Sequence, residues 1–411
     1  MSRNVTDGST EVAANLPLSA LLSQVLIAFT IELDNEFERR MAEAGYSGAL
    51  LSLVVWFNLI RFLADGPIPV GQLAAQTLSP ENRIKFELGC LERWGFVTLD
   101  ADPADTRNMP AQPHRRTGRI LRDGWGSGRG IRSSWIVCLT SKGRKASKIW
   151  PPLLCDIEQR WRNRFDDDEI HHLRLALENV AKQFDLELPW GVPLYLEKAA
   201  PYPVRRTHAE EDLPLPVLLS QLLLAFTIDF DRESPVPLKL CANTLRVLGT
   251  EPIPVSDIPR LTGASSETSG VGWQIKPYIT VERNASAGRG TFARLTPRGL
   301  HVQQTYRKLT EQIEKRWQTK FGKDQIISVK RRLQQLFIRR NEERLLFADG
   351  LIPAEGTVRA GVEAPALGRR DIGTAARRRA RDLAVQTEMF VRDPRTLPHY
   401  PLWDMNRGFG P

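Results

Sequence analysis

An internal repeat constrains this chain more than any other feature of its sequence. The stretch LPLSALLSQVLIAFTIELDNEFE, Leu16–Glu38, returns almost unchanged as LPLPVLLSQLLLAFTIDFDRE, Leu213–Glu233, in constant register and without a gap. A match of this length between two parts of one chain indicates a duplication, and a repeat has to be recognised before a fold is assigned. The chain is therefore expected to contain two copies of one structural unit.

The repeated stretch predicts a long, buried helix at the start of each copy. Pro17 suits the first turn of a helix from about Leu16 to Ala44, because the N–H that proline lacks has no partner there. The beginning of this helix is apolar on nearly all faces, which is typical of a buried helix. Since both copies keep this character, we expect burial between the repeats or between subunits; an ordinary core helix is the alternative.

Composition is typical of a cytoplasmic, globular protein. The 411 residues suffice for two or three domains, and the four cysteines form no CxxC pair, which favours a reducing compartment and argues against zinc or disulfides. The first residues lack the pattern of a signal peptide, and the apolar run Leu16–Ile31 is judged too short and too amphipathic to span a bilayer. The net charge of +9 suggests a polyanionic partner.

Each copy continues with the same order of elements. Helices are expected over Leu50–Ala64 and Leu238–Leu248, and the shared sequence PIPV predicts an extended entry to a short helix. Ser79–Asp100 predicts a helix and then a strand, with Ser79 as N-cap and Pro80 at the first helical position. A loop, a second strand, a long helix and a last helix complete the unit, which is the order of a winged helix-turn-helix.

The fold class expected from this order is mainly α with small β wings, an α+β protein. Five regions follow from the repeat: a disordered leader 1–15, a first repeat 16–187, a Pro-rich connector 188–212, a second repeat 213–345, and a basic C-terminal tail 346–411. The tail is expected to have no counterpart in the first repeat and to pack only in part.

Short motifs mark the boundaries of these elements. They are CLERWGFV at Cys90–Val97, DPADTR at Asp102–Arg107, and the strand exits LTSKG and LTPRG. In this order, and over most of the chain, they resemble MarR-type winged-helix transcription regulators. The resemblance implies a sequence-specific regulator that binds double-stranded DNA and releases it when a small-molecule effector binds. Such proteins are homodimers joined through terminal helices. Two tandem units with dimerisation-type helices therefore imply a pseudo-dimer within one chain, present as a monomer or as a homodimer.

Two regions of the first repeat are candidate DNA contacts. The loop between Asp100 and Trp135, the expected wing, is rich in arginine, whose planar, charged guanidinium suits phosphate. Arg107 has the best individual case, because the resemblance implies an arginine at this point of the wing. The preceding helix carries side chains suited to base edges in the major groove. The candidates are Ser79, Asn82, Arg83, Lys85, Phe86, Arg107, Arg115, Arg116, Arg119 and Arg129. A disordered insertion and a solvated helix face are the alternatives.

The second repeat is expected to contribute less to DNA binding. The sequence LTGASSETSGVGWQIKPY stands where the first repeat has its charged helix, and its glycines weaken a helix. Its wing, RNASAGRG, is short. Ser265, Ser266 and Arg289 are its candidate contacts. The alternative is that small residues allow a close approach of the backbone to DNA.

No catalytic motif is present, so no enzymatic activity, cofactor or metal is expected. His171-His172 and the carboxylates Glu32, Asp34, Glu36 and Glu38 are interpreted as solvated helix surface, with a metal site and acid–base chemistry as the alternatives.

A ligand pocket is expected beside the long helices, and plain core packing is the alternative. Its candidate lining residues are Trp56, Phe57, Trp150 and Trp161. A structural or scaffolding protein, which uses the tandem units for protein–protein contacts, is the competing interpretation of the whole chain.

Overall fold

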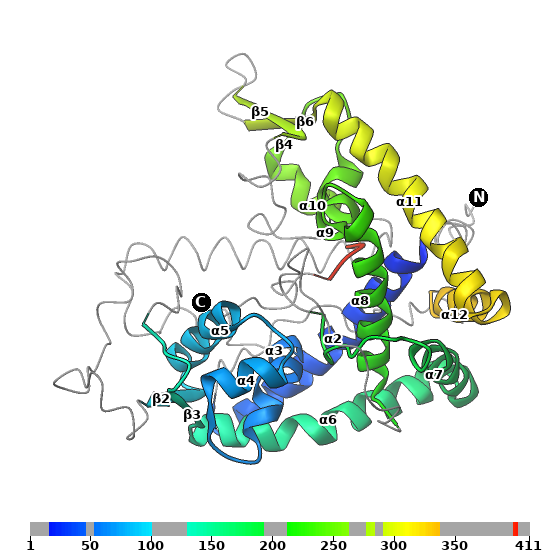
Figure 1. Ribbon diagram of the computed structural model, residues 1–411. Helices are drawn as coiled ribbons and strands as arrows, with labels where there is room; N and C mark the ends of the chain where they lie inside the picture. Colours follow the sequence, from blue (N-terminus) through cyan, green and yellow to red (C-terminus); the bar gives the residue numbers. More distant parts are fainter. Residues whose placement is uncertain are drawn as a thin grey trace, which may run out of the picture.

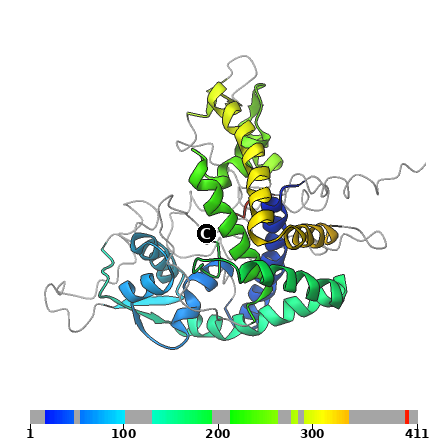
Figure 2. The same cartoon turned by 45° about the vertical axis from the view of Figure 1, so that its right-hand side comes forward.

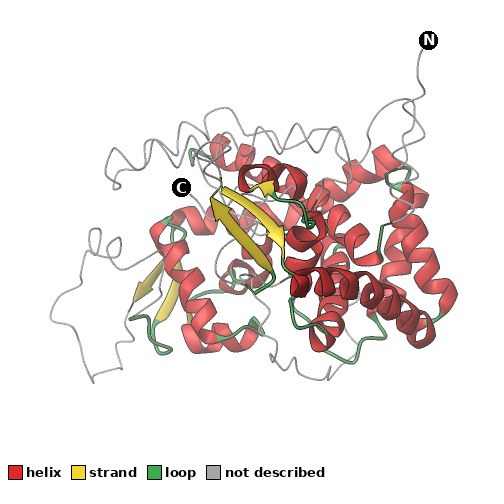
Figure 3. Cartoon of the chain, turned by 90° about the horizontal axis from the view of Figure 1, so that it is seen from above, coloured by secondary structure: helices red, strands yellow, loops and turns green. Residues whose placement is uncertain are grey.

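The described part of the chain is mostly helical and contains two small antiparallel sheets (Figure 1, Figure 3). This confirms the α+β class. The computed structural model describes residues 16–46, 53–100, 130–192, 212–262, 277–283, 291–337 and 398–401. The expected leader 1–15 and most of the C-terminal tail lie outside these ranges.

The first copy of the repeat has the expected order of elements. Its helices and strands are α2 (Leu18–Glu43), α3 (Leu53–Asn58), the 3-10 helix η1 (Ile60–Leu63), β1 (Ile68–Pro69), α4 (Val70–Gln76), α5 (Glu81–Arg93), β2 (Val97–Asp100), β3 (Ile136–Leu139), α6 (Ser141–Phe165) and α7 (Asp167–Ala181). The prediction of one continuous helix over Leu50–Ala64 is wrong, because the described part of this range contains two helices. Leu59 leaves helical geometry with φ −136°, so α3 and η1 are separate elements.

The second copy repeats this order where it is described; residues 263–276, which stand where the first copy has α5, lie outside the described ranges. Its elements are α8 (Leu215–Glu233), α9 (Leu238–Leu240), the π-helix η3 (Cys241–Leu245), β4 (Ile253–Pro254), the 3-10 helix η4 (Val255–Asp257), α10 (Ile258–Thr262), β5 (Ile279–Arg283), β6 (Thr291–Leu295), α11 (Pro297–Phe321) and α12 (Lys323–Gln335). Both sheets have the same topology, with order β1-β3-β2 in the first copy and β4-β6-β5 in the second.

The LTSKG and LTPRG motifs have a physical reason in the start of the long helices α6 and α11. Thr140 and Thr296 are the N-caps, and each side-chain oxygen accepts a hydrogen bond at 3.1 Å from the N–H of the glycine three residues later. A Cβ on Gly143 would lie 2.0 Å from the Phe96 carbonyl oxygen. Gly299 has the same relationship to Tyr278, also at 2.0 Å. Only glycine therefore lets each helix start this close to the preceding segment.

Helices α2 and α8 cross at the centre of the molecule and pack against each other (Figure 1). This confirms the expected burial between the repeats. Among the described helices, α2 is the one that is long and apolar enough to cross a membrane by length and composition, which corrects the length argued from sequence. However, 89% of its most apolar window is buried inside the protein, as in the core helix of a soluble protein.

The far ends of the two copies are interlocked. Helix α7 packs against α12 and α8, and α12 also packs against α2. The two small sheets lie apart from this helical end and from each other (Figure 2). Each copy therefore supplies helices that cover the first helix of the other.

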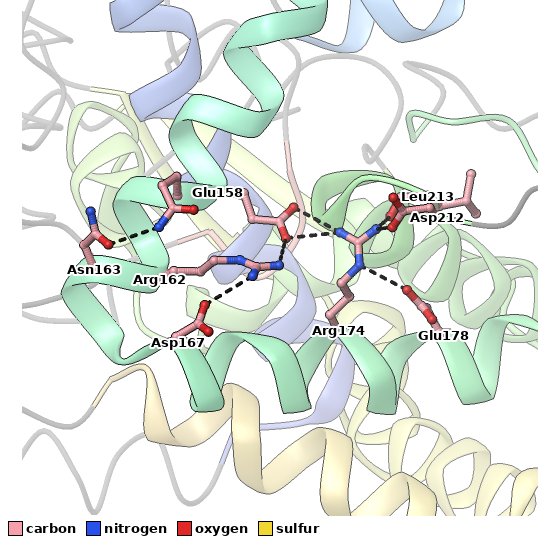
Figure 4. A network of polar contacts seen from close by, with 9 residues as sticks. Glu158, Arg162, Asn163, Asp167, Arg174, Glu178, Asp212 and Leu213 are labelled. Carbon is pink, nitrogen blue, oxygen red and sulfur yellow. Dashed lines mark hydrogen bonds and ion pairs between the residues drawn. The ribbon is translucent and has the colours of Figure 1, made fainter.

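A buried polar network fixes one of these contacts (Figure 4). Arg174 on α7 donates to both carboxylate oxygens of Glu158 on α6, at 3.1 Å each, and to the Leu213 carbonyl at 2.6 Å. It also pairs with Glu178 and Asp212. The α6–α7 pair of the first copy thus holds the entry to α8 of the second.

The reciprocal contact uses the equivalent residues. Glu314 on α11 accepts from Lys330 on α12 at 2.8 Å and from the backbone N–H of Leu18, at the start of α2, at 2.6 Å. Glu314 stands where the first copy has Glu158, and Lys330 where it has Arg174. Each copy therefore uses a paired glutamate to hold the start of the other copy's first helix.

Candidate nucleic-acid interface

Helix α5 carries the described candidates for base contact, and its start differs from the expectation. Pro80 is the N-cap and Glu81 is the first helical residue, so the assignment of Ser79 as N-cap is wrong. The Ser79 hydroxyl instead donates to the Thr77 carbonyl at 3.2 Å. The left-handed backbone of Leu78, with φ 54°, turns the chain between α4 and α5 and moves Ser79 out of the capping position.

Arg83 is held on the surface of α5 by its neighbours. Its Nε lies 2.9 Å from Oε1 of Glu87, and its guanidinium lies 4.8 Å from the centre of the Phe86 ring. Burial raises the pKa of Glu87, while the charge and hydrogen bond of Arg83 oppose that rise. Removing Arg83 would leave a buried carboxylate without this partner, so the residue stabilises the helix as well as being a candidate contact.

Lys85 is also engaged within the protein. Its Nζ lies 2.5 Å from Oε1 of Glu81 and 3.5 Å from Oγ of Ser133, which itself donates to Glu81. The Ser133 carbonyl accepts from the N–H of Gly71 at 2.9 Å, so this cluster ties α5 to α4 and to the segment before β3. Asn82 is exposed, and its Oδ1 accepts from the N–H of Arg83 at 2.8 Å.

The expected wings leave from the ends of the two hairpins. The first lies between β2 and β3, whose register runs from Val97↔Leu139 to Asp100↔Ile136. The second lies between β5 and β6. The candidate residues of these loops and of the second copy's helix lie outside the described residues: Arg107, Arg115, Arg116, Arg119, Arg129, Ser265, Ser266 and Arg289.

The four aromatic residues expected to line a ligand pocket are fully buried and pack in three groups. Trp56 and Trp150 stack with ring centres 5.9 Å apart, and Trp150 also stacks on Phe37 at 4.4 Å. Trp161 meets Phe29 edge-on at 5.2 Å. Phe57 meets Trp190 edge-on at 5.7 Å. The structure thus brings Trp56 and Trp150 together and places Trp161 and Phe57 in other ring pairs.

The interpretation of the α2 carboxylates as solvated helix surface is wrong. All four are buried, with exposed fractions of 8% for Glu32 and 3% for Asp34. Glu32 pairs with Arg164 at 2.5 Å, and Asp34 accepts from the N–H of Leu53 at 3.0 Å. Asp231 of the second copy accepts in the same way from Leu238 at 2.7 Å. The repetition of Asp34 as Asp231 therefore reflects a shared structural role, which is to accept from the first N–H of the following helix.

Glu36 is the centre of a further cluster on α2. Burial on its own raises the pKa of this carboxyl, but hydrogen bonds from Arg39, Arg40 and Arg160 outweigh it and lower the pKa to about 2. The other candidates for acid–base or metal chemistry, His171 and His172, are exposed side by side on α7 with ring centres 5.8 Å apart.

Sequence reasoning missed two side chains, Asn58 and Asn243, as the centres of buried contacts. Asn243 accepts from the N–H groups of His399 and Tyr400 at 2.9 and 3.1 Å and donates to the Tyr400 carbonyl at 3.0 Å. Asn58 accepts from the N–H of Gly191 at 3.2 Å. The two asparagines hold equivalent places in the repeat, and the sequences LPWG at 188–191 and LPHY at 397–400 are the signal that could have linked them.

No protein-family model, no curated protein and no solved structure matches this chain.

Proposed function

We propose that this protein is a cytoplasmic, sequence-specific regulator of transcription that binds double-stranded DNA. In the proposal, two tandem winged helix-turn-helix units form a pseudo-dimer within one chain. The observation that carries it is the pair of sheets with equivalent strand order, β1-β3-β2 and β4-β6-β5. The first is preceded by the helix pair α4–α5, and the second by α10. In helix-turn-helix proteins the second helix of such a pair lies in the major groove.

The reciprocal contacts between the copies support the pseudo-dimer. Glu158 and Arg174 hold the start of α8, while Glu314 and Lys330 hold the start of α2. An exchange of equivalent contacts is what a two-fold relationship produces. Such an arrangement would present two DNA-reading units from one chain.

Charge in the first wing supports a phosphate partner. Residues 101–135, between β2 and β3, contain seven arginines and three aspartates, which leaves a net charge of +4. By contrast, Arg83 and Lys85 on α5 are paired with Glu87 and Glu81. We therefore assign most of the phosphate attraction to the wing, and base contact to exposed polar groups of α5 such as Asn82.

Fluorescence anisotropy with labelled duplex, measured over a range of salt concentrations, tests the proposal. Each phosphate contact contributes about −0.9 to the slope of log affinity against log salt, so replacing Arg115, Arg116 and Arg119 by alanine should flatten the slope by about 2 to 3. The matched control replaces Lys182, at the C-cap of α7, with Lys323 and Arg331 of α12; all three are exposed, and both helices lie away from the sheets (Figure 1). This control should keep the wild-type slope.

The competing proposal, a scaffolding protein, makes a different prediction in the same assay. A scaffolding protein whose tandem units serve protein–protein contacts would bind random duplex weakly, and a heparin competitor would displace that duplex. Selection of bound duplexes from a randomised pool gives the decisive outcome. If no duplex is enriched, the proposal of sequence-specific DNA binding is rejected. The small-molecule effector stays a prediction from the resemblance, and titration with aromatic acids by calorimetry tests it.

A further inference from the structure

The C-terminal region contributes one short buried segment to the second copy. Residues Pro398–Tyr400, red in Figure 1, lie beside α8 and α9. His399 and Tyr400 are only 5% and 3% exposed. Sixty residues, 338–397, separate this segment from Phe337, the preceding described residue. The contact is therefore made by a part of the chain that is distant in sequence.

The segment is bound mainly through its backbone. The Asn243 side chain uses both its oxygen and its nitrogen, accepting from two consecutive N–H groups and donating to the Tyr400 carbonyl. The backbone is bent at His399 and Tyr400, so their consecutive N–H groups converge on one oxygen, and the Asn243 amide satisfies three backbone groups that are buried here. On α2, the Ser23 hydroxyl lies 3.5 Å from the Pro398 carbonyl oxygen.

The first copy holds a segment of its own connector in the same way. The Asn58 oxygen accepts from Gly191, and the Gln221 side chain of α8 donates to the Leu188 carbonyl at 3.4 Å. Each segment therefore lies between the asparagine of one copy and the first helix of the other. In one register, the sequences LPWG from Leu188 and LPHY from Leu397 share the Leu-Pro pair, and Gly191 and Tyr400 are the aligned residues whose N–H groups bond the two asparagines.

The two sites differ in where they place a large side chain: on the helix in the first copy and on the bound segment in the second. Gly191 lies against Phe57, since a Cβ on this glycine would be 3.4 Å from the Phe57 Cβ. In the second copy the position of Phe57 is taken by Ala242, and that of Gly191 by Tyr400, which is buried. A large ring on the helix in one copy thus corresponds to a large ring on the bound segment in the other, as close packing requires.

An aromatic residue follows the proline in each segment, and in each copy an arginine at the equivalent position acts on it. Trp190 receives the guanidinium of Arg61 4.3 Å from its ring centre. His399 occupies the equivalent position, and the charge of Arg246, the counterpart of Arg61, acts on it. Among the described residues neither ring nitrogen of His399 has a hydrogen-bond partner. The site therefore recognises the backbone and the shape of the segment and gains no polar contact from the imidazole.

We infer that Asn58 and Asn243 are the centres of two equivalent peptide-docking sites, each of which takes a bent backbone segment that directly follows a proline, Pro189 or Pro398. The occupant of the second site is the chain's own C-terminal segment, bound in cis. By contacting Asn243 of the second copy and Ser23 of the first, this segment ties the two copies together. The inference does not depend on DNA binding.

Hydrogen exchange in the full-length chain, followed by mass spectrometry, tests the docking. Amides of residues 398–401 should exchange slowly in the wild-type protein and at least tenfold faster in Asn243→Leu. The matched control, Asn58→Leu, should accelerate exchange in 188–192 and leave 398–401 unchanged. Equal rates at 398–401 in wild type and Asn243→Leu would overturn the inference.

A volume swap provides a second test that does not remove the asparagine. Ala242→Phe alone should accelerate exchange at 398–401 at least tenfold, because it adds a ring at the position that lies against the bound segment in the first copy, where the second copy's segment already carries a tyrosine. Adding Tyr400→Gly recreates the pair present in the first copy and should restore most of the protection. If the double variant exchanges as fast as Ala242→Phe alone, the two sites are not equivalent and the inference fails.

Discussion

The indole nitrogen of Trp317 lies 2.9 Å from Oδ2 of Asp229, and this hydrogen bond joins α11 to α8. The equivalent tryptophan of the first copy, Trp161, is fully buried, and its indole nitrogen has no partner among the described residues. Glu32, the counterpart of Asp229, pairs with Arg164 instead. The equivalent helix pairs α2–α6 and α8–α11 therefore differ in the partner of this acidic residue: an arginine in the first copy and a tryptophan in the second.

This difference predicts unequal effects of one substitution at the two tryptophans. Trp317→Phe removes a hydrogen bond to a carboxylate, whereas Trp161→Phe removes a buried donor that has no partner in the described part of the chain. Trp317→Phe should therefore lower the free energy of unfolding by about 1 kcal/mol more than Trp161→Phe does. The two changes delete the same volume, so the difference between their urea unfolding midpoints isolates the hydrogen bond. Equal midpoints would contradict the assignment.

The Arg174 network predicts strong coupling between the copies. Arg174→Ala removes one of the two arginines on the buried Glu158, while Arg162 stays 3.2 Å from it. The cost should therefore be below the value of about 3 to 5 kcal/mol for leaving a buried charge with no partner. Arg174→Lys should cost less, because the second copy has a lysine here, at Lys330, on Glu314. Thermal unfolding of both variants measures this order. A wild-type melting temperature for Arg174→Ala would show that the network contributes nothing to stability.

His399 predicts that docking of the C-terminal segment depends on pH. Burial, with the charge of Arg246, holds the pKa of His399 well below its ordinary value of 6.5. The released segment therefore binds a proton more readily than the docked one. Docking is fully stable above pH 6.5 and weakens as the pH falls below it, by up to about tenfold per pH unit.

Comparison of wild type with His399→Gln at each pH measures this effect, since intrinsic exchange rates cancel. Protection of residues 398–401 should fall from pH 7 to pH 5 in wild type and stay constant in the glutamine variant. Parallel pH profiles would assign the dependence to another group.

The two copies should contribute unequally to DNA affinity. Because Arg83 stabilises the buried Glu87, the cleaner test in the first copy is Asn82→Ala with Lys85→Ala, compared with Ser265→Glu plus Ser266→Glu in the second. The first pair should weaken binding to a selected site more, with each lost base contact costing about 1 to 3 kcal/mol. A larger loss from the serine pair would reverse the proposed asymmetry.

The sequence by itself determined the duplication, the order of elements and the burial of α2 and α8. These features are local: the repeat is in register, a threonine caps each long helix, and a glycine permits its close start. Capping and periodicity act over a few residues, so they can be read from adjacent letters. The same local reading failed at Ser79, where the backbone of Leu78 decides which residue caps α5.

Only the tertiary structure decided how the copies hold each other. Leu18 and Glu314 are 296 residues apart, and Asn243 and Tyr400 are 157 residues apart. No periodicity connects such residues, because their contact depends on how whole helices pack. The carboxylates of α2 illustrate the reason: a helix end rich in acids is typical of a solvated surface, and it is buried here because arginines and free backbone N–H groups from other elements converge on it.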